Sequence, residues 1–425
     1  MKKPISVVFA LLLLVFCPVA AGAQSSLAQS RLAAGTGKAD ITPPPGTPLA
    51  GYGARLGKPS TGVHDPTEAR ALIIDTGDSK IAFVSVDHLG FDHGMVTRIQ
   101  AMASEATGIL RDRIFVMSSH THAGGGAYLE IFPALAGRYD EQVRRHYEEG
   151  AIRAVVMANK NLQPANIAIG AGEARGISRF RSSWPPEGPV DPEVGVIRVD
   201  SRATGRPIAV LMNFAAHPTV LGAKNFEFSA DFVGYARNAI EGMMGGGVMA
   251  IFANGAQGTI APRAFNGKDD WERAENVGQI LAAEVFKVAL MLSPRDVVEI
   301  KVARTPLSIK PQPPAMFPAS VPFPPAYDTE VNVISFDSRF AFVTIPGELS
   351  SILNLQVKER GRLLGFEKTF LLGLTNDALG YIISEDEYRH KTYESTISLF
   401  GPHFGSLIVN EAFQALEKIR PVATR

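Results

Sequence analysis

Apolar runs of strand length alternate with segments of helical period along most of this 425-residue chain, and this alternation narrows its fold more than any other feature. Such alternation is typical of α/β proteins, in which helices cover the faces of a sheet. We therefore expect an α/β fold with mixed β-sheets packed with helices. The predicted strands lie near 35–42 and at 114–117, 167–171, 194–199, 207–214, 247–254, 298–308, 331–336, 340–345 and 369–374, and the predicted helices at 94–106, 140–162, 231–243 and 270–292, from Glu348 and from about residue 403.

A predicted hairpin indicates that the sheets are mixed rather than wholly parallel. Two β-rich runs within 69–90 flank the turn-forming residues 76–79, Thr-Gly-Asp-Ser. The sequence shows no internal repeat and no clear linker. We expect a single large domain over 36–425, preceded by a flexible lead at 24–35.

The first residues have the pattern of a secretory signal peptide. Lys2 and Lys3 precede an apolar run, and small residues at Ala21–Ala23 mark a cleavage site. We expect residues 1–23 to be removed and the mature protein to be secreted or periplasmic. Cys17 is the only cysteine and lies inside this segment, so the predicted mature chain excludes disulfides, thiolate metal sites and a cysteine nucleophile.

Charge and hydropathy exclude several classes of partner. The chain has 42 basic and 42 acidic residues and no basic block, so we do not expect it to bind nucleic acid. No apolar run after the signal peptide is long enough to span a bilayer. A composition that is 46% hydrophobic suits a chain with a large core. No obligate protein partner is evident, and the sequence leaves peripheral contact with a membrane open.

The stretch "VMSSHTHAGGG" places two histidines directly after the apolar run 114–117. In extended backbone, residues i and i+2 face the same side, so His120 and His122 can point into one pocket. Loops after strand ends are where α/β proteins place most of their chemistry, and the glycines allow close backbone approach to a ligand. Because imidazole is a common metal ligand, the motif fits either a metal site or a pair of polar loop histidines.

A second apolar strand, in "IAVLMNFAAHPTVLG", also ends in a histidine, His217. Catalytic zinc usually takes three protein ligands, often including a carboxylate, and keeps a position for water. The carboxylate candidate is Glu348 in "FVTIPGELSS", at a Pro-Gly turn between a strand and a helix. Glu348 equally suits the N-terminus of that helix, where the dipole favours an acidic side chain. Local features leave both roles open.

Three tyrosines crowd into "LGYIISEDEYRHKTYESTISLFGPHFG" near the C-terminus, at Tyr381, Tyr388 and Tyr393. A phenol can bind a metal or donate to a developing oxyanion. Such a segment also suits the face of a surface helix, so these residues alone do not decide between the two roles.

These motifs together resemble the neutral/alkaline (non-lysosomal) ceramidase family over nearly all of the predicted mature chain. The resemblance rests on "GKADITPPPGTPLAGYGAR", "GVHDPTEARALII", "SVDHLGF", "SSHTHAGGG", "VDPEVGVIRVD", "NFAAHP", "PGELS", "GYIISEDEYRHKTYE" and "GPHFG". Members of the family are secreted zinc amidases that hydrolyse the N-acyl bond of ceramide. The resemblance therefore implies the catalytic domain of that family, a bound Zn²⁺ and a lipid-like amide substrate.

The resemblance implies that the zinc is held by His120, His217, Glu348 and a tyrosine. We assign the tyrosine as Tyr381 because its position before the "EDEY" element fits best, with Tyr388 as the less favoured choice.

The remaining implied site residues lie near the substrate. His122 is expected to contact the substrate or support the ligands, and we predict it to carry the proton to the leaving amine. Arg179 in "ISRFRSS" matches the family's arginine near the substrate, with Arg181 a close competitor. Tyr393 is expected near the reaction centre, where it, Tyr381 or Arg179 would stabilise the oxyanion.

Two departures from the family pattern bear on mechanism. The family usually has Gln-Gly-Asp-Val-Ser-Pro where residues 257–262 read Gln-Gly-Thr-Ile-Ala-Pro, so Ala261 stands at the serine position and Thr259 at the aspartate position. That serine is a proposed nucleophile, and alanine has no hydroxyl. Because the implied metal ligands are all present, we predict hydrolysis by zinc-activated water. The chain also stops where the family's C-terminal β-sandwich domain would begin.

These departures leave the substrate open. The first expectation is ceramide or a related N-acyl lipid, and the alternatives are a zinc amidase or esterase with a different small substrate, or an inactive relative that retains the metal. The proline-rich piece 310–327 cannot join a sheet interior. Its Met316, Phe317 and Phe323 could form an apolar rim for lipids, but we favour a crossover packed on the core.

Overall fold

The computed structural model describes Met1, 32–245, 247–263, 265–314, Phe317 and 321–421. Apart from Met1, the predicted signal peptide lies outside the described residues, as do residues 24–31 of the predicted lead. The helices and strands belong to the unit Arg31–Arg425.

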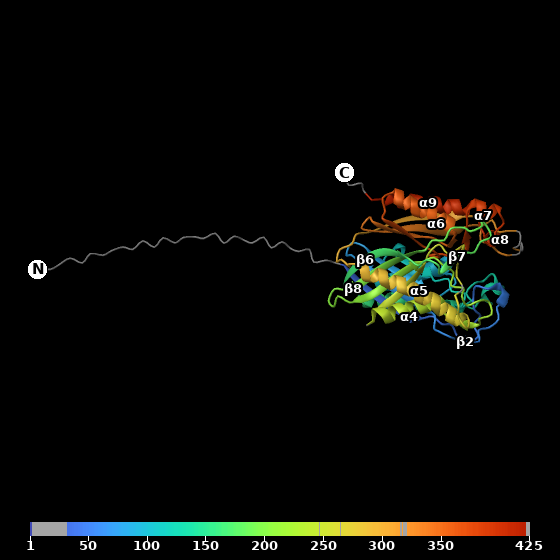
Figure 1. Cartoon of the computed structure of the whole chain (residues 1–425), viewed down its shortest axis with the longest axis horizontal. Coiled ribbons are helices and arrows are strands. Elements are labelled where there is room, and N and C mark those ends of the chain that lie inside the picture. The colour runs from blue at the N-terminus through green and yellow to red at the C-terminus, as the bar shows by residue number, and fades with distance from the viewer. Residues whose placement is uncertain (2–31, 246, 264, 315–316, 318–320, 422–425) are drawn as a thin grey trace. The chain divides into compact units, whose positions relative to one another are not determined.

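Two sheets lie face to face between outer layers of helices (Figure 1). The larger sheet has eight strands in the order β11-β9-β8-β6-β1-β3-β4-β5. They are β1 (Ala33–Asp40), β3 (Glu68–Asp75), β4 (Lys80–Val86), β5 (Ile114–Ser118), β6 (Gln163–Glu173), β8 (Glu193–Ser201), β9 (Pro207–Phe214) and β11 (Met249–Asn254). The sheet is mixed, because β3 and β4 form the predicted antiparallel hairpin while β4 and β5, and β9 and β11, run parallel.

The smaller sheet has four strands in the order β13-β14-β15-β17. They are β13 (Ile300–Ile309), β14 (Tyr327–Phe336), β15 (Phe340–Thr344) and β17 (Lys368–Leu372). β15 and β17 run parallel, whereas the other neighbours are antiparallel. Helices α6 (Ser351–Leu363) and α9 (Phe404–Lys418) cover the outer face of this sheet.

Four long helices cover the outer face of the larger sheet. They are α1 (His93–Thr107) and α3 (Glu141–Lys160) over one half, and α4 (Phe232–Met244) and α5 (Asp270–Met291) over the other. Helix α3 lies close to β1 because Gly37 has no side chain there. A Cβ on Gly37 would lie 2.3 Å from the carbonyl oxygen of Ala154.

Both faces of the larger sheet are buried, and this explains why β3 and β4 are apolar almost without interruption. On the inner face, Phe83 packs against the smaller sheet with its ring centroid 6.4 Å from that of Phe342. Burial of each such aromatic side chain contributes about 1.5–3 kcal/mol. The structure therefore confirms the predicted α/β fold with mixed sheets.

Two predicted boundaries are wrong. Strand β1 begins at Ala33, so residues 33–35 belong to the sheet and not to the flexible lead. The helix predicted from Glu348 begins at Ser351, and Ser350 caps it by accepting from the Leu353 N–H. Glu348 instead lies on a short strand, outside the first helical turn, so the role at a helix N-terminus is excluded.

The short elements were not predicted, since most of them pair residues far apart in the chain. They are β2 (Gly62–Val63), β7 (Ser178–Phe180), β10 (Glu227–Phe228), β12 (Ile260–Pro262), β16 (Glu348–Leu349), β18 (Tyr381–Ile382), α2 (Pro133–Ala136), α7 (Glu385–Arg389) and α8 (Tyr393–Ile397).

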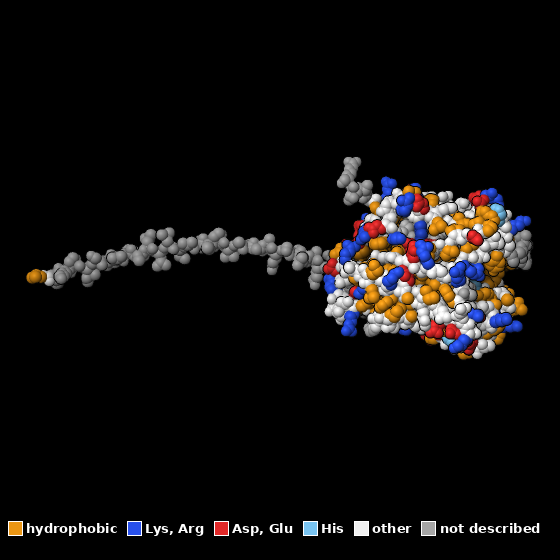
Figure 2. Space-filling model, in the orientation of Figure 1, with side chains coloured by type: hydrophobic (Ala, Val, Ile, Leu, Met, Phe, Trp, Pro, Cys, Tyr) orange, Lys and Arg blue, Asp and Glu red, His pale blue; other side chains and the backbone are white. Residues whose placement is uncertain are grey.

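The proline-rich piece ends where β14 begins at Tyr327. Its Phe317 and Phe323 both pack against Phe132, with ring centroids 5.4 and 6.5 Å away. Met316 lies outside the described residues. Among the helices of the described part of the chain, none is long and apolar enough to cross a bilayer. Figure 2 shows basic and acidic side chains interspersed over one face.

Candidate metal centre

Polar side chains from separate strand ends meet at one place in the fold. His120 follows the carboxyl end of β5, and His217 follows that of β9. Glu348 on β16 pairs in register with Tyr381 on the parallel strand β18. Because registered partners on neighbouring strands point to the same face of a sheet, Glu348 and Tyr381 present their side chains to the same side.

The histidines and the glutamate are in direct contact. Glu348 Oε2 lies 3.2 Å from His120 Nε2 and 3.0 Å from His217 Nε2. His122 Nε2 lies 3.4 Å from His120 Nε2. All four side chains are buried, and one nitrogen from each of the three imidazoles lies within 4.8 Å of the others. This cluster could hold a metal ion.

Each of two imidazoles is oriented by a backbone carbonyl. His120 Nδ1 donates to the Leu89 carbonyl at 2.6 Å, and His217 Nδ1 donates to the Gln257 carbonyl at 2.7 Å. In the neutral form, an imidazole with its proton on Nδ1 has a free lone pair on Nε2, and both Nε2 atoms face Glu348. Metal-binding histidines usually have this arrangement.

The atoms that face one another are left without ordinary hydrogen bonds. Neither His217 Nε2 nor Glu348 Oε2 has a hydrogen-bond partner among the described residues, although both are buried. Burial by itself would raise the pKa of Glu348, but His120 and His217 hold it well below its usual range. Burial lowers the pKa of His217 to about 4. A carboxylate beside two imidazole nitrogens is a donor set that can bind a divalent cation, so these residues fit a metal ion.

Asn254, at the end of β11, fastens the two histidine loops together. Its Nδ2 donates to the carbonyls of Ser119, at 2.8 Å, and Ala216, at 3.1 Å, the residues directly before the two histidines. His120 itself has a φ of +71°, a strained conformation for a residue with a side chain. Asn254 could not be recognised from the sequence, since its partners are distant in the chain.

The turn formed by residues 257–260 contacts several parts of the cluster. The Gln257 carbonyl orients His217, and the Gly258 N–H donates to the Leu349 carbonyl at 2.9 Å, directly beside Glu348. Gly258 is required here because a Cβ would lie 2.4 Å from the carbonyl oxygen of Glu348.

We expect Gly258→Ala to displace Glu348 and to weaken both the fold and metal binding. The new methyl group would meet backbone, which cannot move aside, so unfolding should become easier by about 1–3 kcal/mol. Urea unfolding of the metal-free protein and zinc affinity by chelator competition measure the two effects. Gly242→Ala is the control, because a Cβ there meets nothing within 4 Å. Equal behaviour of the two variants would refute this role for the turn.

Sequence comparisons relate this chain to a known protein family. Residues 32–272 match the family model described as neutral/alkaline non-lysosomal ceramidase, N-terminal. The chain belongs to this ceramidase family. It is 28% identical over 254 residues to neutral ceramidase A of Dictyostelium discoideum and 27% identical over 248 residues to the neutral ceramidase of Pseudomonas aeruginosa. Each match covers 54% of this chain, but only 35% and 36% of the two relatives.

A solved ceramidase has the same fold. The crystal structure of neutral ceramidase from Pseudomonas aeruginosa matches with a TM-score of 0.80 at 19% identity, covering 93% of this chain and 76% of that chain. The family model confirms the membership predicted from the motifs, and the similarity in fold extends beyond residue 272 into the smaller sheet.

Ala261, which the motif resemblance places at the ceramidase family's serine position, has no hydroxyl, and Thr259 does not replace it. Thr259 Oγ1 accepts from the Ser351 N–H at 3.0 Å and lies 3.1 Å from the Ser351 hydroxyl. The Thr259 hydroxyl is therefore hydrogen-bonded to Ser351, the first residue of α6. Ala261 lies on β12, opposite Arg179 on β7.

The structure brings Arg181 to the cluster and leaves Arg179 outside it. Arg179 is exposed, whereas Arg181 Nη2 donates to the Tyr381 hydroxyl at 2.7 Å and to the Gly258 carbonyl at 2.9 Å. Arg181, which the sequence offered as the alternative to Arg179, is therefore the arginine beside the cluster.

The three tyrosines have different surroundings. Tyr381 is buried, with its ring 6.4 Å from that of His217. Tyr393 starts α8, is 62% exposed, and has its ring 6.2 Å from that of Tyr381. Tyr388 lies on α7, where its N–H donates to the Ser384 carbonyl and its carbonyl accepts from the Lys391 N–H.

His122 is held by residues 51–55, where no site residue was predicted. Its ring packs edge-on against Tyr52 at 4.7 Å, and its carbonyl accepts from the buried Arg55. Gly51, with φ +103°, leaves room for the ring, since a Cβ there would lie 2.6 Å from it. Burial is the largest cause, and the neighbouring His120 the second, of a pKa of His122 that lies well below its usual value.

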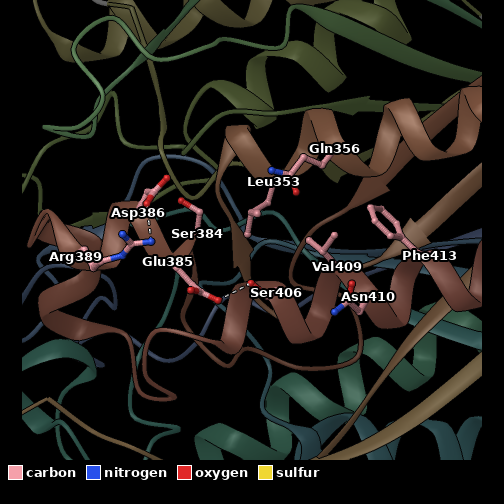
Figure 3. Close-up of a pocket in the computed structure, with 10 residues that line it drawn as sticks. All are labelled: Leu353, Gln356, Ser384, Glu385, Asp386, Arg389, Ser406, Val409, Asn410 and Phe413. Atoms are coloured by element: carbon pink, nitrogen blue, oxygen red, sulfur yellow. Dashed lines mark hydrogen bonds and ion pairs between the residues drawn. The ribbon is translucent and has the colours of Figure 1, made fainter.

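A cavity of about 250 Å³ between α6, α7 and α9 lies apart from the cluster (Figure 3). Its acidic side chains are already paired, Glu385 with His403 and Ser406, and Asp386 with Arg389. None of the predicted site residues lines it. The buried histidine cluster is therefore the candidate functional site.

Proposed function

We propose that this chain is a metal-dependent amide hydrolase that cleaves the N-acyl bond of ceramide or a related N-acyl lipid. We assign Zn²⁺ as the ion and His120, His217, Glu348 and Tyr381 as its ligands. The observation that carries the proposal is the approach of two Nε2 atoms to the same buried Glu348 oxygen, at 3.2 and 3.0 Å. Family membership supports the reaction class, because the named relatives are ceramidases.

The ion would supply the Lewis acid and the activated water that replace a side-chain nucleophile. Bound zinc acts as a Lewis acid on a carbonyl and lowers the pKa of a coordinated water to about 7. Water is the proposed nucleophile, since Ala261 has no hydroxyl and the Thr259 hydroxyl is bonded to Ser351.

His122 is proposed to move the proton. Its lowered pKa keeps the imidazole neutral at pH 7, so one of its ring nitrogens has a free lone pair that can accept a proton and return it to the leaving nitrogen. Arg55 and Tyr52 hold the residue in place for this step. Tyr393, exposed beside Tyr381, is proposed to donate a hydrogen bond to the substrate oxygen as negative charge develops.

A substrate panel tests this proposal. We expect the purified protein to hydrolyse N-acyl sphingosines in detergent micelles, to lose activity with a chelator and to regain it with zinc. His120→Ala should be inactive, whereas His403→Ala, which changes an exposed histidine, should match the wild type. Undiminished activity in His120→Ala would refute the scheme, and zinc binding without turnover of any amide or ester would refute hydrolysis.

A second candidate function is an amidase or esterase for a smaller substrate. It is favoured by Ala261 and Thr259, which change the loop beside His217 relative to the family pattern. Activity confined to short N-acyl amines or simple esters in the same panel would support it over ceramide.

We also propose that residues 1–23 direct export, as their composition indicates. N-terminal sequencing of protein recovered outside the cytoplasm should then begin at Gln24, and a retained Met1 would contradict this.

A further inference from the structure

We infer that Glu394 is a positioning residue that acts through Arg181 on the hydroxyl of Tyr381, and thereby fixes the phenol oxygen for the metal. The inference rests on the proposed function and adds to it a residue for which neither the motifs nor the comparisons give a role.

Glu394 is a buried carboxylate on α8, with its side chain 2% exposed. Its Oε2 accepts from the Ser182 hydroxyl at 2.8 Å, and its Oε1 lies 3.8 Å from Arg181 Nε. Burying a charged carboxylate is unfavourable unless a cation or donors compensate it. Ser182 and Arg181 supply that compensation, so Glu394 and Arg181 fix each other's position.

Arg181 is held at a second point by the turn that also orients His217. Its Nη2 and Nε approach the Gly258 carbonyl at 2.9 and 3.3 Å, and its backbone N–H donates to the Thr259 carbonyl at 2.9 Å. The guanidinium is therefore anchored by a carboxylate and by a carbonyl, and the same Nη2 reaches the Tyr381 hydroxyl at 2.7 Å.

The direction of this last hydrogen bond sets the orientation of the phenol oxygen. A guanidinium has only donors, so the Tyr381 oxygen must accept from Arg181. The remaining lone pair and the O–H bond then point away from Arg181. The in-register pairing with Glu348 and the nearby ring of His217 place Tyr381 against the histidine cluster. Arg181 thus leaves the free side of the phenol oxygen for the ion.

The test is a spectroscopic signature that a purely structural residue would not change. Copper-loaded protein should show a tyrosinate-to-copper charge-transfer band that Tyr381→Phe abolishes. We expect Glu394→Gln and Arg181→Gln to shift or weaken this band and to lower zinc affinity about tenfold to a hundredfold. Arg179→Gln and Glu385→Gln are the matched controls, because both residues lie outside the cluster, and both should keep the wild-type band.

Ser182→Ala serves as a milder variant that retains both charges and removes one hydrogen bond to Glu394. It should fold and shift the band less than Glu394→Gln, and circular dichroism checks the fold of each variant. A wild-type band and wild-type zinc affinity in Glu394→Gln, or in Ser182→Ala if Glu394→Gln does not fold, would overturn the inference.

Two further outcomes separate this inference from the function on which it rests. Zinc-dependent amidase activity in a protein whose copper form has no Tyr381-dependent band would overturn the inference and the assignment of Tyr381 as a ligand, but would leave the proposed hydrolase activity intact. Failure of the wild-type protein to bind zinc or copper would overturn both.

Discussion

Glu348→Gln should leave a folded protein that binds no zinc and whose amidase activity is lower by about a thousandfold or more. The substitution keeps the shape of the side chain but removes the negative charge of Glu348, whose Oε2 lies 3.2 Å from His120 Nε2 and 3.0 Å from His217 Nε2. Lewis-acid catalysis by a metal lowers the activation free energy by several kcal/mol, and each 1.4 kcal/mol corresponds to about tenfold in rate. Loss of the ion should therefore remove nearly all turnover.

Metal analysis and amidase assays on the same preparations measure this effect. Glu359→Gln is the matched control, since Glu359 pairs with Arg362 on the exposed side of α6, the helix that follows Glu348. It should retain zinc and activity. If Glu348→Gln held as much zinc as Glu359→Gln, the carboxylate would not be a ligand.

His122→Ala should retain zinc and still lose activity by about a hundredfold to ten-thousandfold, the range typical of a lost general acid or base. The ring of His122 lies within 3.4 Å of His120, so geometry alone permits it to be a metal ligand. The proposed donor set instead uses the carboxylate that contacts both His120 and His217. The two assignments predict opposite zinc contents.

The decisive comparison is zinc content in His122→Ala against that in His217→Ala. Retention of zinc in the first and loss in the second would support a proton-transfer role for His122. Equal loss of zinc in both would contradict it and make His122 a third imidazole ligand. His146→Ala is a control outside the cluster, since His146 contacts the Thr42 carbonyl.

The positions of the long helices and strands could be predicted because they depend on local patterns. Helix α5, for example, was expected at 270–292 and spans Asp270–Met291, and the hairpin of β3 and β4 follows from its turn residues. The hypothesis of four metal ligands could also be made from the sequence, because histidines follow the ends of apolar strands and the motifs resemble the ceramidase family. What the sequence supplied was the identity of these residues, not their contacts.

The features that were missed depend on contacts between distant segments. The helix expected from Glu348 begins instead at Ser351, because Glu348 pairs with Tyr381, 33 positions later, and belongs to a strand. Arg179 was preferred over Arg181 because nothing local shows which arginine reaches the Gly258 carbonyl. Asn254 has no motif at all, since its role is to join the loops before His120 and His217.

X-ray diffraction at the zinc absorption edge, on crystals of the zinc-loaded protein, tests the central claim most directly. The account predicts one strong anomalous peak about 2.0–2.2 Å from His120 Nε2, His217 Nε2 and a Glu348 oxygen, with the Tyr381 oxygen as the fourth protein ligand. A peak at another place in the molecule, or a site that stays empty while the protein hydrolyses amides, would contradict it.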